Sequence, residues 1–226
     1  MKTKILRIGS NLGRQELIDK IGPVASALRR SALVAFPTET VYGLGCDPFD
    51  EIAVQRLFDV KGRLCSKPLI LLVGSIEEAW SLSAEVPETA IKLANRFWPG
   101  PLTLALTQGK NVPDSVCGGT GTVSVRLSPH RIPLALVRKF GGPVTAPSAN
   151  LSGAPTAQTV DDVKAQLDGK IDWIIDERST ERSATSTILN LAGNHPTLLR
   201  AGCISTEELE TVLGQTISNA KLNPTG

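Results

Sequence analysis

Apolar and polar positions along this chain repeat with two different periods, and the alternation predicts strands separated by helices. Short continuous apolar runs are typical of buried strands, whereas apolar residues three and four positions apart indicate a helix with one buried face. The predicted strands cover residues 4–8, 32–36, 68–73, 102–107, 123–127, 171–175, 186–191 and 197–200. The predicted helices cover residues 15–30, 50–61, 87–97, 132–140 and 159–167, with others beginning at 75 and 205.

Side chains that accept hydrogen bonds from a first helical turn predict where several helices begin. Capping boxes, with an acidic residue three positions after a hydroxyl, are expected at Ser75, Thr159 and Ser205. Asp50 is expected to cap the helix that ends near residue 61, in which Ile52, Leu57 and Phe58 should face the core.

The order of the elements is that of an α/β protein. Ala192–His195 separates two strand-like runs and predicts an antiparallel hairpin, so the sheet should not be all-parallel. We expect a twisted, open sheet with mixed parallel and antiparallel pairs, flanked by helices. A single domain should cover residues 1–214, followed by a flexible tail at 215–226.

Composition narrows the function classes. The chain has 226 residues, a net charge of +2 and only 4% aromatic residues, which disfavours a base-stacking nucleic-acid module. Its four cysteines form no C-x-x-C pair and only two histidines are present, so no metal site is predicted. No apolar run approaches the length that spans a membrane and no secretory signal is evident, so we expect a cytoplasmic protein.

The segment Phe36–Gly45 holds the first candidate chemistry, because two threonines, a tyrosine and two glycines follow a strand-like run. Hydroxyls can bind polar ligand groups, and glycines allow close approach of the backbone. Three cations follow at Lys61, Arg63 and Lys67. They predict a cradle for a small anion, although charges at a helix end also complement its dipole or are simply solvated.

A second loop, Thr145–Gly153, is rich in small polar residues that suit phosphate or ribose oxygens. Its Ser148 and Asn150 also have the alternative of satisfying local backbone groups. Ser148 is not in a G-x-S-x-G sequence, which disfavours a serine hydrolase.

Arginines on two predicted strands are further candidates. Arg126 alternates with apolar residues and can either face solvent or bind a carboxylate in a cleft. Ser186 and Arg200 lie on opposite arms of the predicted hairpin, as ligand groups or as cross-strand surface neighbours.

Together these segments occur in an order that closely resembles the YrdC-like family of threonylcarbamoyl-AMP synthases, over roughly residues 15–205. The resemblance rests on residues 37–45, 61–69, 98–103, 123–127, 146–153, 186–188 and 199–202. It implies a twisted α/β fold with a basic concave face, in the short single-domain form. Leu64 and Ser128 stand where relatives often have proline.

The resemblance implies an enzyme, a nucleotidyltransferase that joins L-threonine, bicarbonate and ATP into threonylcarbamoyl-AMP and releases pyrophosphate. Mg²⁺ would accompany the ATP phosphates. A tRNA-threonylcarbamoyl transferase complex would then use the product to modify tRNA. The alternatives are a non-catalytic factor that binds tRNA or double-stranded RNA in translation or ribosome maturation, a carbamoyl-transfer domain, and a structural partner in a tRNA-modifying complex.

The resemblance also implies residue roles. Those expected to hold L-threonine are Thr40, Arg126 and Ser186. Those expected on the ATP side are Arg63, Lys67, Thr122, Ser148, Asn150, Thr156 and Arg200. Lys61 and Arg63 are the expected catalytic cations. Thr122 and Thr156 rest on the resemblance alone.

Overall fold

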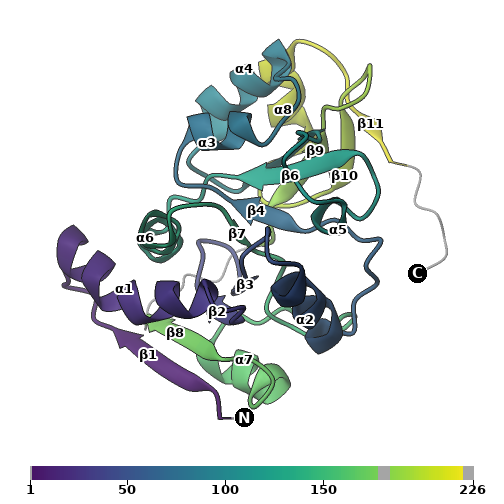
Figure 1. Ribbon diagram of the computed structural model, residues 1–226. Coiled ribbons are helices and arrows are strands. Elements are labelled where there is room, and N and C mark those ends of the chain that lie inside the picture. Colours follow the sequence, from purple (N-terminus) through teal and green to yellow (C-terminus); the bar gives the residue numbers. More distant parts are fainter. Residues whose placement is uncertain (1, 178–183, 221–226) are drawn as a thin grey trace.

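The computed structural model describes residues 2–177 and 184–220, and its strands form two mixed sheets (Figure 1). The smaller sheet has the order β1 (Lys4–Ile8), β8 (Trp173–Glu177), β2 (Val34–Phe36) and β3 (Gly43–Gly45). The larger has the order β11 (Ser218–Asn219), β10 (Thr197–Arg200), β9 (Thr187–Asn190), β5 (Leu102–Thr107), β6 (Thr122–Arg126), β4 (Ile70–Leu72) and β7 (Val144–Thr145).

Parallel and antiparallel pairs occur in both sheets, which confirms the mixed α/β fold predicted from the sequence. In the smaller sheet β8 pairs in parallel with β1 and β2, whereas β3 is antiparallel to β2. In the larger sheet, β9 and β10 form the predicted antiparallel hairpin. The difference from expectation is that the strands form two sheets and not one.

Helices cover the two sheets separately. They are α1 (Arg14–Leu28), α2 (Glu51–Lys61), α3 (Ile76–Ser81), α4 (Glu88–Phe97), α5 (Asp114–Cys117), α6 (Arg131–Phe140), α7 (Val160–Leu167) and α8 (Thr206–Leu213). Figure 1 shows α3, α4 and α8 grouped beside the larger sheet, with α1 and α7 beside the smaller one. The helix α6 lies against α1, and apolar side chains from both share a core with β2 and β8.

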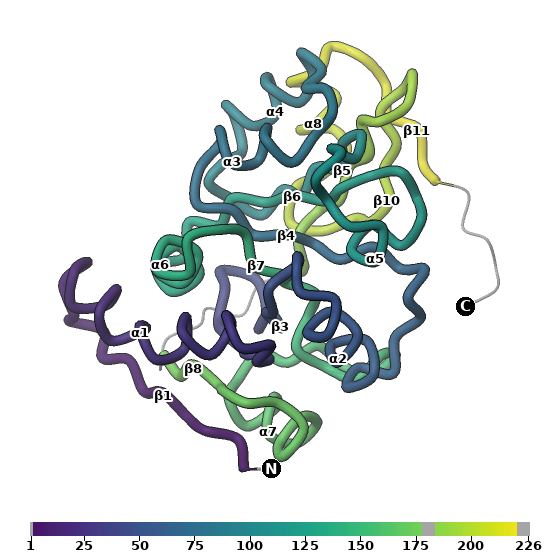
Figure 2. Tube along the Cα trace, viewed as in Figure 1, coloured from purple at the N-terminus to yellow at the C-terminus, as the bar shows by residue number. Residues whose placement is uncertain are grey.

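The two sheets meet where β3 approaches β7, near the middle of the molecule (Figure 2). The backbone N–H of Thr145 donates to Cys46 O at 3.1 Å, and that of Leu44 donates to Pro147 O at 2.8 Å. A Cβ atom on Gly45 would lie 2.6 Å from the Phe36 ring and 2.7 Å from Val144, so only glycine permits this approach. This contact between β3 and β7 brings the β2–β3 loop close to the loop after β7.

Most predicted helix starts are confirmed. Asp50 accepts hydrogen bonds from Ile52 N and Ala53 N, and Thr159 and Ser205 form complete capping boxes. Ser75 also caps its helix, but the side chain of Glu78 accepts from Gly74 N instead of closing the box.

The predicted burial of α2 is partly wrong. Leu57 and Phe58 are buried as expected, but Ile52 is 68% exposed. The buried face of α2 contains Ala53 and Leu57, four positions apart, and Ile52 precedes that face by about 100° of helical rotation.

Four short elements were not predicted: β3, β7, α5 and β11. The first is nearly all glycine, and the others have two to four residues, too few for a periodic pattern. The strand β11 also changes the picture of the tail. Residues 218–219 pair in parallel with β10, and Ile217 is buried, so residues 217–219 pack on the sheet, whereas Gln215 and Thr216 are exposed. Residues 221–226 lie outside the described part of the chain.

Gly202 allows the chain after β10 to pass directly over the start of β9. A Cβ atom there would lie 2.3 Å from Thr185 O and 2.4 Å from Ser186 C, both backbone atoms. We therefore expect Gly202→Ala to lower the free energy of unfolding by about 1–3 kcal/mol. Urea titration followed by circular dichroism measures this change.

Gly193→Ala is the matched control, because a Cβ atom at Gly193, in the turn of the same hairpin, meets no atom within 4 Å. Equal stability of the two variants would contradict the close-approach argument.

Candidate functional site

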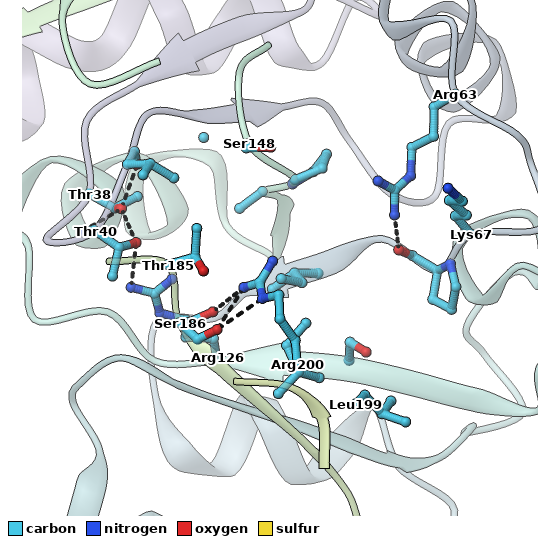
Figure 3. Close-up of a pocket in the computed structure, with 18 residues that line it drawn as sticks. Thr38, Thr40, Arg63, Lys67, Arg126, Ser148, Thr185, Ser186, Leu199 and Arg200 are labelled. Atoms are coloured by element: carbon cyan, nitrogen blue, oxygen red, sulfur yellow. Dashed lines mark hydrogen bonds between the residues drawn. The ribbon is translucent and has the colours of Figure 1, made fainter. Parts of the chain in front are cut away.

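A cavity of ≈ 250 Å³ opens between the two sheets, and loops from both line it (Figure 3). Most of the polar residues predicted from the sequence meet here. The predicted residues that line the cavity are Thr40, Arg63, Lys67, Arg126, Ser148, Ser186 and Arg200. The lining residues that were not predicted include Thr38, Ser124, Thr185 and Leu199.

One end of the cavity is built around the guanidinium of Arg126, which projects from β6 and is only 5% exposed. Its Nη2 atom donates to Glu39 Oε1 at 2.5 Å and to Thr40 Oγ1 at 3.1 Å, and its Nε atom donates to Gly100 O at 3.3 Å. Thr40 also shares a hydrogen bond of 3.0 Å with Thr38. These contacts fix Arg126 before any ligand binds.

Ser186 lines the cavity beside Arg126 and is held from two sides (Figure 3). Its Oγ atom accepts from Arg200 Nη2 at 2.8 Å and lies 3.0 Å from Thr103 Oγ1. The Nε and Nη2 atoms of Arg200 also donate to Ser186 O. The predicted proximity of Ser186 and Arg200 across the hairpin is thus present, with both residues facing the cavity rather than lying on the outer surface.

Arg63 and Lys67 line the opposite side of the cavity from Arg126 and Thr40 (Figure 3). Gly62 ends α2 in the left-handed conformation, with a φ of 57°, and turns the chain so that Arg63 points inward. Arg63 Nη2 donates to Pro68 O at 3.0 Å, while its buried Nε atom has no hydrogen-bond partner. Lys67 is exposed.

The cations of the cavity repel one another. Burial, and then the charges of Arg126 and Arg63, lower the pKa of Arg200, and burial lowers the pKa of Arg63. Arginine nevertheless stays charged at neutral pH. The cavity is thus an enclosed region of high positive potential, and an anion that enters it meets donors that are already in place.

Lys61, a predicted catalytic cation, does not line the cavity. It is 2% exposed, and its Nζ atom donates to Ser148 O at 2.5 Å and to Asn150 O at 2.6 Å. Burial, and then the charge of Arg63, lower the pKa of Lys61 to about 8. In this geometry Lys61 holds the loop carrying Ser148, and its catalytic role stays a prediction.

Asn150 also builds this loop and does not line the cavity. Its Nδ2 atom donates to Leu151 O at 2.8 Å and to Ala154 O at 2.9 Å, and its buried Oδ1 atom has no partner in the described chain. Thr122 bonds to Thr120 and Thr156 is exposed, and neither lines the cavity. Their ATP-side roles therefore stay predictions.

Sequence reasoning missed the roles of Glu39 and Thr103. Glu39 hydrogen-bonds to Arg126 and Ser128, which are 87 and 89 positions away in the chain. Thr103 lies 83 positions from Ser186. The pairing of β5 with β9 brings Thr103 beside Ser186, whereas Glu39 reaches Arg126 from the loop between β2 and β3 of the smaller sheet.

Two further findings concern the described residues only. No three histidine, cysteine, aspartate or glutamate side chains in residues 2–177 and 184–220 are grouped so that they could hold a metal ion. Within the same ranges, each helix is too short or too polar to cross a bilayer.

Comparison with known proteins gives the family. Residues 26–202 match the family model described as telomere recombination, which groups Sua5, YciO and YrdC proteins, and the chain belongs to this family. It is 46% identical over 196 residues to a threonylcarbamoyl-AMP synthase of Pyrococcus abyssi, covering 87% of this chain and 58% of that protein. A Bacillus subtilis protein of the same name is 42% identical, with coverages of 86% and 57%.

A crystal structure supports the same relationship. The structure of P. abyssi Sua5 complexed with L-threonine superposes with a TM-score of 0.89 at 43% identity, covering 95% of this chain and 62% of that one. The chain thus spans a little under three fifths of the two named synthases.

The burial of Lys61 predicts that its loss lowers stability more than the loss of Lys67 does. Lys61→Met removes two charged hydrogen bonds and leaves the carbonyls of Ser148 and Asn150 without the ammonium donor. We expect the free energy of unfolding to fall by about 2–4 kcal/mol. Thermal unfolding measures the change.

Lys67→Met is the matched control, because Lys67 is exposed and no hydrogen bond of its side chain is present among the described residues. Its stability should stay within about 0.5 kcal/mol of the parent chain. A Lys61→Met variant as stable as this control would show that the ammonium does not hold the loop.

Proposed function

We propose that this chain makes threonylcarbamoyl-AMP and pyrophosphate from L-threonine, bicarbonate and ATP. The observation that carries the proposal is the convergence, from both sheets, of three arginines with threonine and serine hydroxyls on one cavity. The family and the names of the similar synthases agree with this use of the cavity.

L-threonine occupies the end formed by Arg126, Thr40 and Ser186 in this proposal. A guanidinium is suited to a carboxylate, and the fixed hydroxyls supply the partners that the substrate's polar groups lose on leaving water. The support from a relative is that P. abyssi Sua5, 43% identical to this chain, has been crystallised with L-threonine.

ATP occupies the end formed by Arg63, Lys67, Arg200 and Ser148. The cations match the negative charge of a triphosphate, and the buried, unpartnered Nε atom of Arg63 is a donor without an acceptor in the described chain. Mg²⁺ arrives with ATP, bound mainly by phosphate oxygens and water.

The reaction needs two bonds to form. The neutral threonine amine attacks the carbon of bicarbonate, the bond from that carbon to one oxygen breaks, and water leaves to give a carbamate. A carbamate oxygen then attacks the α-phosphorus of ATP, and the bond to the β-phosphate oxygen breaks to release pyrophosphate. Both reactants in the second step are anions, so cations that offset their repulsion and hold them in line lower the barrier.

This chemistry requires no covalent enzyme intermediate. Arg63 and Arg200 are held in place by bonds to Pro68 O and Ser186 O, so little reorganisation is needed when charge develops on the phosphates. The product is an activated acyl-adenylate, and we propose that a tRNA-threonylcarbamoyl transferase complex consumes it to modify tRNA.

The test of the function is pyrophosphate release from ATP with bicarbonate and Mg²⁺, with and without L-threonine. We expect release that depends on L-threonine and a product whose mass is that of threonylcarbamoyl-AMP. If folded protein gives no threonine-dependent release, the enzymatic proposal fails. Salt-dependent binding of tRNA by the same preparation would then favour an RNA-binding factor.

Arg63 provides the residue-level test. Arg63→Ala removes a preorganised cation from the phosphate end, and we expect kcat/KM for ATP to fall about 10²-fold or more while the circular dichroism spectrum is retained. Arg30→Ala is the control, because Arg30 is an exposed arginine just after α1 and does not line the cavity. Equal turnover by both variants would remove Arg63 from the site.

A further inference from the structure

Glu39 places a carboxylate directly against the guanidinium of Arg126. Its Oε1 atom accepts from Arg126 Nη2 at 2.5 Å, and its Oε2 atom accepts from Ser128 Oγ at 2.5 Å. The Arg126 side chain is 6% exposed and that of Glu39 is 20% exposed, so solvent screens the pair only weakly. Ser128 Oγ accepts in turn from His130 N, which fixes the hydroxyl that supports Glu39.

These contacts use one whole side of Arg126. Nη2 is occupied by Glu39 and Thr40, and Nε by Gly100 O, whereas Nη1 makes no hydrogen bond to the described residues. Arg126 lines the cavity. Its Nη1 atom is not one of the buried side-chain atoms that lack a hydrogen-bond partner. A ligand therefore meets Arg126 through Nη1 alone while Glu39 stays in place.

The described lining of the cavity carries an excess of positive charge. Its described lining contains Arg63, Lys67, Arg126 and Arg200 and no acidic side chain. A polyanion such as pyrophosphate would be attracted to all four cations alike. Figure 3 shows Arg126 and Thr40 at one side, and Arg63 and Lys67 at the other. Among these four cations Glu39 hydrogen-bonds to Arg126, so its negative charge offsets the positive charge at that end of the cavity and leaves the other end cationic.

We propose that Glu39 is a positioning residue that neutralises Arg126 and thereby divides the cavity into two ends. The neutral end accepts a zwitterion, whose carboxylate binds the Nη1 edge, and it does not compete for phosphates. The cationic end keeps the polyanion. The identity of the zwitterion as L-threonine rests on the proposed function, whereas the exclusion of phosphates from Arg126 does not.

Binding of inorganic pyrophosphate, measured by isothermal titration calorimetry, tests the proposed division of the cavity into two ends. The measurement does not depend on catalysis. In Glu39→Gln the amide keeps the shape and can still bond to Arg126 and Ser128, but the negative charge is gone. Arg126 then gains a charged hydrogen bond to the anion, and we expect pyrophosphate to bind about tenfold more tightly than to the parent chain. The double variant Glu39→Gln/Arg126→Ala should lose this gain.

Two controls separate charge from structure. Ser128→Ala removes a hydrogen bond to Glu39 but keeps the carboxylate, so its pyrophosphate affinity should stay within about twofold of the parent chain. In the parent chain, L-threonine and pyrophosphate should bind together without competing, whereas in Glu39→Gln pyrophosphate should weaken L-threonine binding.

Unchanged pyrophosphate affinity in folded Glu39→Gln, or a gain that survives Arg126→Ala, would overturn the inference. If Glu39→Gln does not fold, the parent chain decides, because competition between L-threonine and pyrophosphate there would also overturn it. Failure of the proposed function gives a different result. L-threonine would then neither bind nor promote pyrophosphate release, while the change in pyrophosphate affinity on Glu39→Gln would persist.

Discussion

The buried ammonium of Lys61 is the contact on which the cavity depends. It lies at the last residue of α2 and binds two carbonyls of the loop after β7, and the Lys61 carbonyl accepts from Ser152 N at 2.8 Å. One residue thus joins α2 to a loop 87 positions away. Burying a cation is costly, and the two carbonyl acceptors repay part of that cost. Without this link the loop that carries Ser148 would lose two hydrogen bonds to α2.

A second constraint is that the cavity concentrates like charges before any ligand binds. Holding these like charges together costs free energy, and the lowered pKa of Arg200, caused by burial and by Arg126 and Arg63, reflects that cost. The protein limits the cost by giving the guanidinium groups carbonyl and hydroxyl acceptors, at Pro68, Ser186 and Gly100. A bound polyanion removes the remaining repulsion, so the site is less stable empty than filled.

Much of the fold follows from local signals in the sequence. Asp50, Thr159 and Ser205 cap helices as predicted, because capping depends only on residues three or four positions apart. The division into two sheets does not follow from such signals. It depends on the approach of β3 to β7, two strands about 100 positions apart in the chain. Two of the three residues of β3 are glycines, and Gly45 allows the close approach.

The candidate site divides in the same way. Residue types and order made Arg63, Arg126 and Arg200 candidates but left a surface role open for each, and the resemblance to the family selected them. Residue types and order were not sufficient to separate a ligand-facing lysine from a structural one, since Lys61 and Lys67 have the same side chain and lie six positions apart. Burial decides between them: the exposed Lys67 lines the cavity, and the buried Lys61 stands behind it.

Ser128 supports the carboxylate that contacts Arg126. A proline there would have neither a hydroxyl to donate to Glu39 nor a side-chain acceptor for His130 N. The carboxylate of Glu39 would then depend on Arg126 and its remaining neighbours for its position. Because a charge held by two fixed donors keeps one orientation, the serine makes the Glu39–Arg126 pair more rigid. The hydroxyl of Ser128 therefore supports the pair that orients Arg126.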